Sequence, residues 1–327
     1  MKEVALDTSI DSHPRVSILI PCYNAIPFIS ETLDSVLAQT CTNWECIIVD
    51  DHSSDNSVNI INEYREKYPN KFSLYINPRK GACAARNVAF EESKGTYIQY
   101  LDADDLLSPN KIEEQLKLFS QFGENILVNC KCGRFTGNKE SVKWEKQPID
   151  KDYDHPIEWL TDSWMGNGMA ANSCWLIPRH LIEKAGPWNE SLQINQDGEF
   201  FSRVLIHAQA IKFAPDAGVY YRSGNVQSIT QNKPQSRAKA ESLLRSYQSY
   251  ERVLSIHDTP AIRKALGNNY LTYLYQFNSL FPDLCNKAEQ AFKELGLKKM
   301  WAVGGKSFQK LVKIVGFRNA LKIKKIT

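Results

Sequence analysis

The chain has 327 residues, of which 43% are hydrophobic, enough to bury one sizeable core or two modest ones and to exclude disorder as its main state. With 40 Lys and Arg against 37 Asp and Glu, the net charge of +3 argues against a nucleic-acid-binding protein. The basic charge lies in the tail: residues 292–327 contain ten Lys or Arg and one acid, a net +9, which leaves −6 for the rest of the chain.

The cysteine pattern and the N-terminal sequence point to an intracellular environment. Eight cysteines are scattered along the chain without a C-x-x-C pair, and the first residues lack the apolar stretch of a secretory signal. We therefore expect reduced thiols and a cytoplasmic location. No window approaches the roughly 20 apolar residues that a bilayer-spanning helix needs, so any membrane contact should be peripheral.

Residues 16–136 show the pattern of an α/β unit, in which apolar runs rich in Val and Ile alternate with segments of helical periodicity. The first run, VSILIP, is apolar apart from one Ser, as expected of a strand buried on both faces of a parallel sheet. Strands are predicted over 16–21, 46–51, 72–76 and 96–101. Helices are predicted from about residue 29, around 58–64, over 82–93 and after Pro109.

The pattern is less regular beyond residue 137. A strand and a helix are predicted over 174–185, a helix over 197–208, and short strands over 211–213 and 219–221. From about residue 235 the sequence is mostly helical. We therefore expect a boundary between an α/β part and a helical part in the polar stretch 223–234.

Two acidic clusters follow predicted strands, DD at 50–51 and DADD at 102–105. Ligands of open α/β sheets bind outside the carboxyl ends of the strands, where both clusters should lie. Asp102 and Asp104 flank the small Ala103, so two carboxylates can converge on a hard cation while leaving room for a bulky ligand. Because Mg²⁺ and Mn²⁺ take carboxylate and phosphate oxygens, a metal-bridged diphosphate is the natural ligand. The alternative for an isolated D-x-D is a helix cap or a solvated turn.

Five motifs follow one another along the first part of the chain. They are VSILIPCYN at the first strand, SVLAQT on the first helix, IIVDDHSSDNS after the second strand, GACAARN before the third helix and YIQYLDADD after the fourth strand. In this order and spacing the sequence resembles the family 2 glycosyltransferases over about residues 14–125, and 175–205 resembles the family's acceptor-side region.

The resemblance implies an inverting glycosyltransferase with the GT-A fold, a Rossmann-like α/β sheet flanked by helices. It implies a catalytic domain over 14–230, with a nucleotide-sugar half (14–125) and an acceptor half (126–230). A C-terminal helical region with a basic tail would follow over 231–327.

The resemblance also implies which residues bind the nucleoside of the donor. Pro21 and Tyr23 would border it, and Asp50 would pair with the base and ribose end of the nucleotide sugar. Asp51 belongs to the same donor-binding motif. For Asp50 and Asp51 the alternative is a cap on the helix that follows.

The diphosphate end of the donor is implied to lie near the second acidic cluster. Arg86 of the ARN motif would reach the diphosphate or the nucleoside, with a surface ion pair as the alternative. Asp102 would contact the ribose or the metal, Ala103 would line the donor site, and Asp104 would be the main ligand of a divalent cation, Mn²⁺ or Mg²⁺.

The catalytic base is expected in the family's Glu-Asp motif, which here is Gln196-Asp197. Asp197 matches the general base that would deprotonate the acceptor hydroxyl, with a helix cap as its alternative role and Glu199 as the fallback base. Gln196 and Arg203 would lie on the acceptor side. Trp164, beside the sequence MGNG, is the tryptophan most suited to contact an acceptor sugar, with a place in the apolar core as its alternative.

Two other functions remain alternatives. A sugar-phosphate nucleotidyltransferase could use similar carboxylates, but the sequence after the first strand, PCYNAIPF, lacks the Gly and basic residue of a phosphate loop. A catalytically silent sugar-nucleotide or glycan binder would not need both the D-x-D and the candidate base. The expected partners are therefore a nucleotide sugar, by default a UDP-sugar, and a glycan or lipid-linked glycan acceptor of polysaccharide biosynthesis, with no nucleic acid.

The basic tail has two interpretations. Residues 306–326 mix apolar and cationic side chains at spacings that allow one apolar helix face flanked by lysines. Such a segment could hold the enzyme at the inner face of an anionic membrane. Alternatively, its apolar face packs on the rest of the protein and its lysines are solvated.

Overall fold

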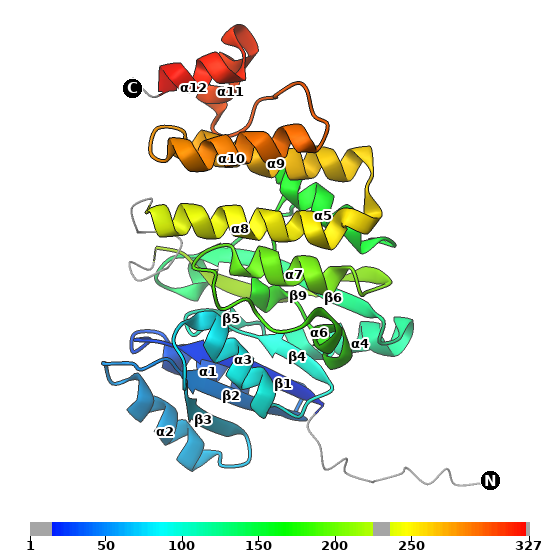
Figure 1. The fold of residues 1–327 in the computed structure, drawn as a ribbon. Coiled ribbons are helices and arrows are strands. Elements are labelled where there is room, and N and C mark those ends of the chain that lie inside the picture. The colour runs from blue at the N-terminus through cyan, green and yellow to red at the C-terminus, as the bar shows by residue number, and fades with distance from the viewer. Residues whose placement is uncertain (1–14, 225–235, 325–327) are drawn as a thin grey trace, which may run out of the picture.

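The computed structural model describes residues 15–224 and 236–324, which form successive layers from an N-terminal sheet to a C-terminal pair of helices (Figure 1). The first layer is a five-stranded sheet in the order β3-β2-β1-β4-β8. Its strands are β1 (Val16–Cys22), β2 (Trp44–Asp50), β3 (Phe72–Ile76), β4 (Tyr97–Tyr100) and β8 (Ile177–Pro178). The first four are parallel, as predicted, and β8 is a short antiparallel edge strand.

Helices cover both faces of this sheet. The cluster of apolar side chains on one face includes α1 (Ile29–Leu37) and α2 (Ser57–Lys67), and the cluster on the other includes α3 (Ala82–Glu92). Ile18 and Ile20 of β1 pack with α1, whereas Leu19 packs with α3. Because successive side chains of a strand point to opposite faces, a strand covered on both sides needs apolar residues throughout.

A second sheet, in the order β5-β9-β6-β7, lies above the first. It consists of β5 (Leu106–Leu107), β6 (Ile126–Phe135), β7 (Lys143–Trp144) and β9 (Ala210–Arg222), with α4 (Lys111–Phe122) against β6 and β9. The two short strands predicted over 211–213 and 219–221 are one strand. Cys130 of β6 pairs with Ala214 and Lys131 with Gly218, so the residues between Ala214 and Gly218 bulge out of the ladder.

Short helices lie between β6 and β9 along the chain. They are η1 (Lys139–Ser141), α5 (Pro156–Asp162), η2 (Ser163–Asn167), η3 (Asn172–Cys174), α6 (Arg179–Ala185) and α7 (Gln196–Leu205). The helix predicted over 197–208 corresponds to α7, which ends earlier.

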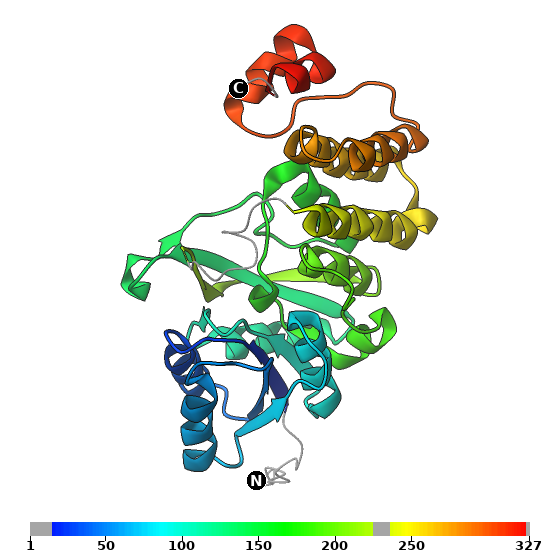
Figure 2. The ribbon, with the colours of Figure 1, turned by 60° about the vertical axis from the view of Figure 1, so that its left-hand side comes forward.

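The C-terminal part is helical, as predicted. It comprises α8 (Arg237–Leu254), η4 (Ser255–His257), α9 (Pro260–Phe277), α10 (Pro282–Glu294), α11 (Lys306–Val315) and α12 (Phe317–Lys324). Figures 1 and 2 show that these helices lie progressively farther from the first sheet. Most of the predicted boundary, including position 230, falls outside the described residues.

The helices and the sheets share one apolar cluster. Tyr100 of β4, Phe200 of α7, Tyr250 of α8 and Phe308 of α11 all belong to it. None of the helices described in the structure combines the length and apolar character needed to span a bilayer.

Candidate active site

The turns after β1 and β2 lie side by side and form the predicted nucleoside side of the site. The backbone N–H of Asn24 donates to Ser53 Oγ (2.9 Å), and the Ser54 N–H donates to Asn24 Oδ1 (2.8 Å). Pro21 is half-buried, whereas the side chain of Tyr23 is 60% exposed. The aromatic ring of Tyr23 is thus accessible to a ligand at the carboxyl ends of these strands.

Asp50 is buried at the end of β2. The residue is only 2% exposed, and its Oδ2 accepts a hydrogen bond from the Ser53 N–H (3.0 Å). Its Oδ1 is buried without a hydrogen-bond partner in the described parts of the chain. Since buried polar atoms are normally paired, this oxygen suits an N–H or O–H of a bound nucleoside.

Asp51 binds a neighbouring segment of the protein instead. Its Oδ1 accepts a hydrogen bond from Asn77 Nδ2 (2.7 Å), and both of its oxygens lie within 3.0 Å of the Gly81 nitrogen. Gly81 immediately precedes α3. The carboxylate therefore holds the start of α3, the helix that carries Arg86, rather than capping α2.

Asp102 is the point at which three segments meet. Its Oδ1 accepts hydrogen bonds from Arg86 Nη2 (2.8 Å) and from Asn172 Nδ2 (3.0 Å). Its side chain remains 33% exposed. Ala103, which follows, is buried and its carbonyl accepts a hydrogen bond from Thr32 Oγ1 (3.0 Å), which ties this turn to α1.

Asp105 and Arg222 fix the turn that carries Asp104. Asp105 is fully buried, and its Oδ1 accepts a hydrogen bond from the Arg222 N–H (2.9 Å). Burial, together with the neighbouring Asp104 and Asp102, raises the pKa of Asp105 well above its ordinary value. Arg222 Nε donates to the Asp104 carbonyl (2.8 Å), and Nη2 lies 2.5 Å from Glu31 Oε2.

Asp102 and Asp104 fit a divalent cation that is shared with a ligand. In residues 15–224 and 236–324, no group of three or more His, Cys, Asp or Glu side chains converges as a metal site. Within the described residues, the hydrogen bonds to the Asp102 carboxylate go to Oδ1, which leaves Oδ2 for another partner. Mg²⁺ and Mn²⁺ commonly take one or two carboxylates when phosphate oxygens complete their shell.

Arg86 connects the D-x-D turn to α7. Besides its ion pair with Asp102, Arg86 Nη1 donates to Gln196 Oε1 (3.2 Å), and the guanidinium lies 4.6 Å from the centre of the Trp188 ring. The Arg86 side chain is only 6% exposed, so the surface ion pair considered from the sequence is wrong. Burial lowers the pKa of this guanidinium, but the Asp102 and Asp197 carboxylates outweigh burial and raise the pKa above its ordinary value, which keeps Arg86 cationic.

The first turn of α7 is built around an unusual backbone conformation. Asn195 has φ 57° and ψ 32°, in the left-handed region that Asn tolerates better than most residues. Its Nδ2 donates to Ser246 Oγ (2.7 Å) and Tyr250 Oη (2.6 Å) of α8. Gly198 is needed here, since a Cβ would come within 2.2 Å of Tyr250 Oη.

Asp197 lies on this turn and is partly buried. Burial raises its pKa above the ordinary value of 3.8; the Arg86 cation opposes this shift and the Asp102 carboxylate adds to it. A carboxylate with a raised pKa is a stronger base at neutral pH. The structure therefore places the predicted base within the electrostatic influence of both Arg86 and Asp102.

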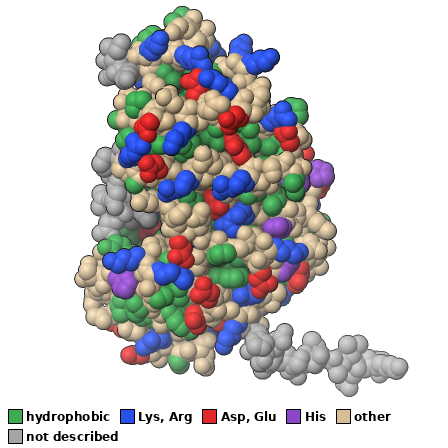
Figure 3. All heavy atoms as spheres, viewed as in Figure 1, with side chains coloured by type: hydrophobic (Ala, Val, Ile, Leu, Met, Phe, Trp, Pro, Cys, Tyr) green, Lys and Arg blue, Asp and Glu red, His purple; other side chains and the backbone are tan. Residues whose placement is uncertain are grey.

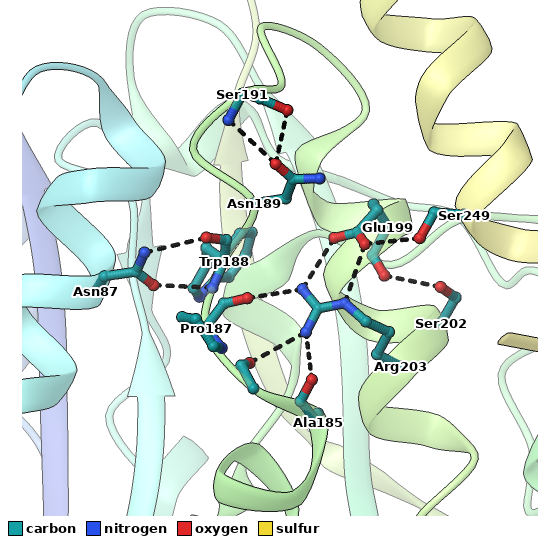
Figure 4. A network of polar contacts seen from close by, with 11 residues as sticks. Asn87, Ala185, Pro187, Trp188, Asn189, Ser191, Glu199, Ser202, Arg203 and Ser249 are labelled. Atoms are coloured by element: carbon teal, nitrogen blue, oxygen red, sulfur yellow. Dashed lines mark hydrogen bonds and ion pairs between the residues drawn. The ribbon is translucent and has the colours of Figure 1, made fainter. Parts of the chain in front are cut away.

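The buried Glu199 forms an ion pair with the partly buried Arg203, which faces a loop of the protein (Figure 4). Arg203 Nη2 lies 2.9 Å from Glu199 Oε2, and Ser249 Oγ donates to Glu199 Oε1 (2.9 Å). Arg203 also donates to the carbonyls of Ala185, Gly186 and Pro187. With Glu199 only 3% exposed, this geometry favours a positioning role for both residues over a fallback base or an acceptor contact.

Trp164 lies near the same turn of α7. Its ring stacks on Tyr250 with 4.4 Å between centroids and 19° between planes, and its carbonyl accepts a hydrogen bond from Asn268 Nδ2 (2.7 Å). It belongs to η2, a π-helical turn in which Gly166 has φ 90°. Trp164 is half-buried, so Tyr250 fixes its orientation while part of its surface stays accessible.

Sequence reasoning missed Asn172 and Arg222. Neither belongs to a recognisable motif, and each becomes informative only through its contact with the D-x-D turn. The available signal was weak: each is a polar residue beside apolar runs, in AANSCWLIP and GVYYR. Polar side chains are buried only where the folded protein provides hydrogen-bond partners for them, and a sequence pattern does not show where those partners lie.

Comparison with known proteins agrees with this architecture. Residues 17–185 match the family model described as Glycosyl transferase family 2. A protein of Bacillus subtilis named for teichuronic acid biosynthesis is 39% identical over 149 residues, which are 45% of this chain and 55% of that protein. A second relative is a β-1,3-glucosyltransferase of Escherichia coli, whose name includes UDP-Glc and α-D-GlcNAc-diphosphoundecaprenol. It is 41% identical over 104 residues, which are 32% of this chain and 40% of that protein. The first relatives are matched over between 55% and 59% of their length.

Solved structures show the same fold at low sequence identity. Staphylococcus aureus TarS, in complex with UDP-GlcNAc, has a TM-score of 0.61 at 15% identity and covers 86% of this chain and 89% of its own. A mannosyltransferase from Pyrobaculum calidifontis, solved with GDP-Man and Mn²⁺, has a TM-score of 0.54 at 18% identity. The match covers 97% of this chain and 88% of that protein. The predicted GT-A fold is thus confirmed, and since the family model spans more than half of the sequence, the chain belongs to glycosyl transferase family 2.

Proposed function

We propose that the chain is a metal-dependent, inverting glycosyltransferase that moves a sugar from a nucleotide diphosphate sugar to a hydroxyl of a glycan acceptor. The observation that carries this proposal is the contact chain from Asp102 through Arg86 to Gln196. It joins the candidate donor site at the strand ends to the candidate base, Asp197, on the adjacent residue of α7. A donor diphosphate and an acceptor hydroxyl could meet there.

The chemistry is a single in-line displacement. The acceptor oxygen forms a bond to the anomeric carbon as the bond from that carbon to the diphosphate oxygen breaks, with inversion. Asp197 takes the proton of the attacking hydroxyl. A divalent cation held by Asp104 and Asp102 would offset the charge on the departing nucleoside diphosphate, and the cationic Arg86 adds to the same field.

The donor is proposed to be a UDP-sugar. The buried, unpartnered oxygen of Asp50 suits a pyrimidine N–H. Tyr23 is exposed and directly follows Cys22, which is the partner of Asp50 in the β1–β2 register. The name of one similar protein mentions UDP-Glc, and TarS was solved in complex with UDP-GlcNAc; both support the same choice.

The acceptor is proposed to be a surface polysaccharide precursor, glycan or lipid-linked. Teichuronic acid and a diphosphoundecaprenol acceptor in the names of two relatives support it. We also propose that the enzyme works at the inner face of a membrane, with peripheral contact through residues 306–326. Residues 231–327 are proposed to be a helical region that supports a catalytic domain over 14–230.

Neither alternative fits the residues as well. A nucleotidyltransferase would be expected to bind phosphate with a glycine-rich loop after β1, where this chain has PCYNAIPF. A silent binder would not need a carboxylate with a raised pKa beside the D-x-D turn.

The decisive experiment is sugar transfer or hydrolysis from a panel of nucleotide sugars, with and without chelator. Activity should disappear on chelation and return with Mn²⁺ or Mg²⁺. Asp104→Asn should lose activity and metal-dependent donor binding while its melting temperature stays near wild type, because a partly exposed turn carboxylate contributes little to the core. Asp216→Asn, on an exposed bulge, is the matched control. Full activity of Asp104→Asn in chelator would refute the metal role.

A further inference from the structure

The C-terminal helices use their apolar faces inside the protein. Phe308 of α11 packs on Tyr275 of α9 with 4.8 Å between ring centroids, and Val312 is buried. Phe317 and Leu321 of α12 are also buried. The apolar face that the sequence offered to a membrane is therefore already covered, and any membrane contact must use the outer surface of these helices.

That outer surface is strongly cationic. Residues 292–324 contain nine Lys or Arg, all exposed, and one acid, Glu294. Lys306, Lys310 and Lys313 recur at intervals that place them along one side of α11. Ile314, next to Lys313, is 81% exposed. Figure 3 shows Lys and Arg side chains on this end of the molecule.

A pocket of about 690 Å³ lies on the same end, between the segment after α10 and the junction of α11 with α12. Its lining includes four cations, Lys293, Lys298, Lys299 and Arg318, and no carboxylate. Apolar side chains, among them Phe292 and Met300, provide the remainder. A pocket with a cationic rim and apolar walls matches the chemistry of an anionic amphiphile.

The cations of the pocket differ in how they are held. Glu289 lies 3.1 Å from Lys293 Nζ and 2.5 Å from Arg318 Nη2, so these two side chains are oriented by an acid outside the pocket lining. Lys298 and Lys299 have no ion pair with any residue that the structure describes. Lys293 and Arg318 are already oriented by Glu289, and Lys298 and Lys299 can turn toward a ligand. Together these cations can neutralise a phosphate.

We propose that this pocket binds the phosphate headgroup of an anionic membrane lipid, with the Lys306, Lys310 and Lys313 side of α11 and Ile314 resting on the same leaflet. Charge complementarity identifies the occupant, because an anionic leaflet attracts clustered Lys and Arg. Figures 1 and 2 show α8, α9 and α10 between this end and the first sheet, so a bound headgroup is separate from the candidate active site. The inference refines the proposed membrane contact but does not depend on sugar transfer.

The first test is flotation of the full chain with vesicles of phosphatidylcholine alone or with phosphatidylglycerol. Binding should require phosphatidylglycerol and weaken with salt. The variant Lys298→Gln/Lys299→Gln should lose more than about 25-fold in affinity, since each cation near an anionic leaflet contributes about fivefold and these two also contact the bound headgroup. The distant pair Arg65→Gln/Lys67→Gln on α2 is the control and should bind as wild type. Equal loss in this control would overturn the proposal.

A second comparison separates a headgroup site from diffuse attraction. Lys306→Gln/Lys313→Gln removes the same charge from outside the pocket and should lose less affinity than Lys298→Gln/Lys299→Gln. Equal losses would overturn the headgroup site. Inorganic phosphate should compete only weakly with the vesicles; tight binding of free phosphate would refute a lipid source. Asp104→Asn should still float, and both tail variants should keep donor hydrolysis without vesicles, so this test is independent of the proposed catalytic function.

Discussion

At the scale of single residues, Asp197 combines partial burial with the opposing influences of Arg86 and Asp102. Asp197→Asn keeps the size of the side chain but cannot accept a proton at neutral pH. Turnover should fall by roughly 10²-fold or more, while donor affinity changes little. Glu199→Gln should retain more activity than Asp197→Asn, because the Glu199 carboxylate already accepts hydrogen bonds from Arg203 and Ser249 and is not placed to take a proton from an acceptor.

The pH dependence follows from the same residue. The base must be deprotonated, so wild-type activity should fall as the pH drops through the raised pKa of Asp197. The acid limb of the turnover profile should therefore lie above pH 3.8, the ordinary value for Asp. It should be missing from the residual activity of Asp197→Asn. An unchanged acid limb in that variant would assign the base to another group.

At the scale of elements, Arg203 connects the end of α6 to α7. It neutralises the buried Glu199 and donates to three backbone carbonyls of the loop that leads to Trp188. Arg203→Met should lower the free energy of unfolding by about 3 kcal/mol or more, because it leaves a buried carboxylate unpaired. Adding Glu199→Leu should recover part of this loss in denaturant titrations. If the two effects simply add, the pair does not act as a unit.

Lys111 at the start of α4 is another buried charge, and Gln99 of β4 accepts its ammonium hydrogen bond. Burial lowers the pKa of Lys111 to about 8, against 10.5 for an ordinary Lys, although Cys130 and Cys174 oppose the shift. Between pH 8 and 10.5 the unfolded chain binds more protons than the folded one, so this residue's contribution to stability rises with pH and is constant below 8.

Lys111→Met should test this directly. The stability of the wild type relative to Lys111→Met should increase between pH 8 and 10.5 by up to about 3 kcal/mol. Subtracting the two proteins removes the titration of Tyr and Cys residues that both share. A stability difference that stays constant over this pH range would mean that Lys111 is not protected from solvent.

At the scale of the whole molecule, the helical part supports the candidate site. Ser242 Oγ of α8 accepts hydrogen bonds from the Gln193 N–H (2.8 Å) and the Ile194 N–H (3.1 Å), just before α7. Ser246 and Tyr250 hold Asn195. The residues that position Asp197 therefore come from beyond the proposed catalytic domain.

Truncation should reveal this dependence. A chain that ends at Gly224 should lose cooperative unfolding and bind a hydrophobic dye, because it exposes the apolar side of α7. A chain that ends at Gly305 should unfold cooperatively at a lower temperature, because it loses only the packing of α11 and α12. Calorimetry of both forms decides the question, and a cooperative transition in the shorter chain would show that the catalytic part folds alone.

The sequence alone determined the parallel sheet, the position of both acidic clusters and the family. The sheet and the clusters follow from local rules: a strand covered on both faces is apolar throughout, as in β1, and parallel strands end at one edge. For the same reason Asp50, Asp102 and Asp104 could be placed at the strand ends before any contact was known. The family was indicated instead by the resemblance of five motifs in order.

Only the tertiary structure decided how those residues are paired and what covers each apolar face. Arg86 is buried between Asp102 and Gln196, which are far apart in sequence, and Asn172 joins them from a separate segment. The tail shows the same limit: its periodicity predicts an apolar helix face, but that pattern is identical whether lipid or Tyr275 covers it. Periodicity specifies which side of an element is buried, whereas the partner depends on long-range packing that no local pattern encodes.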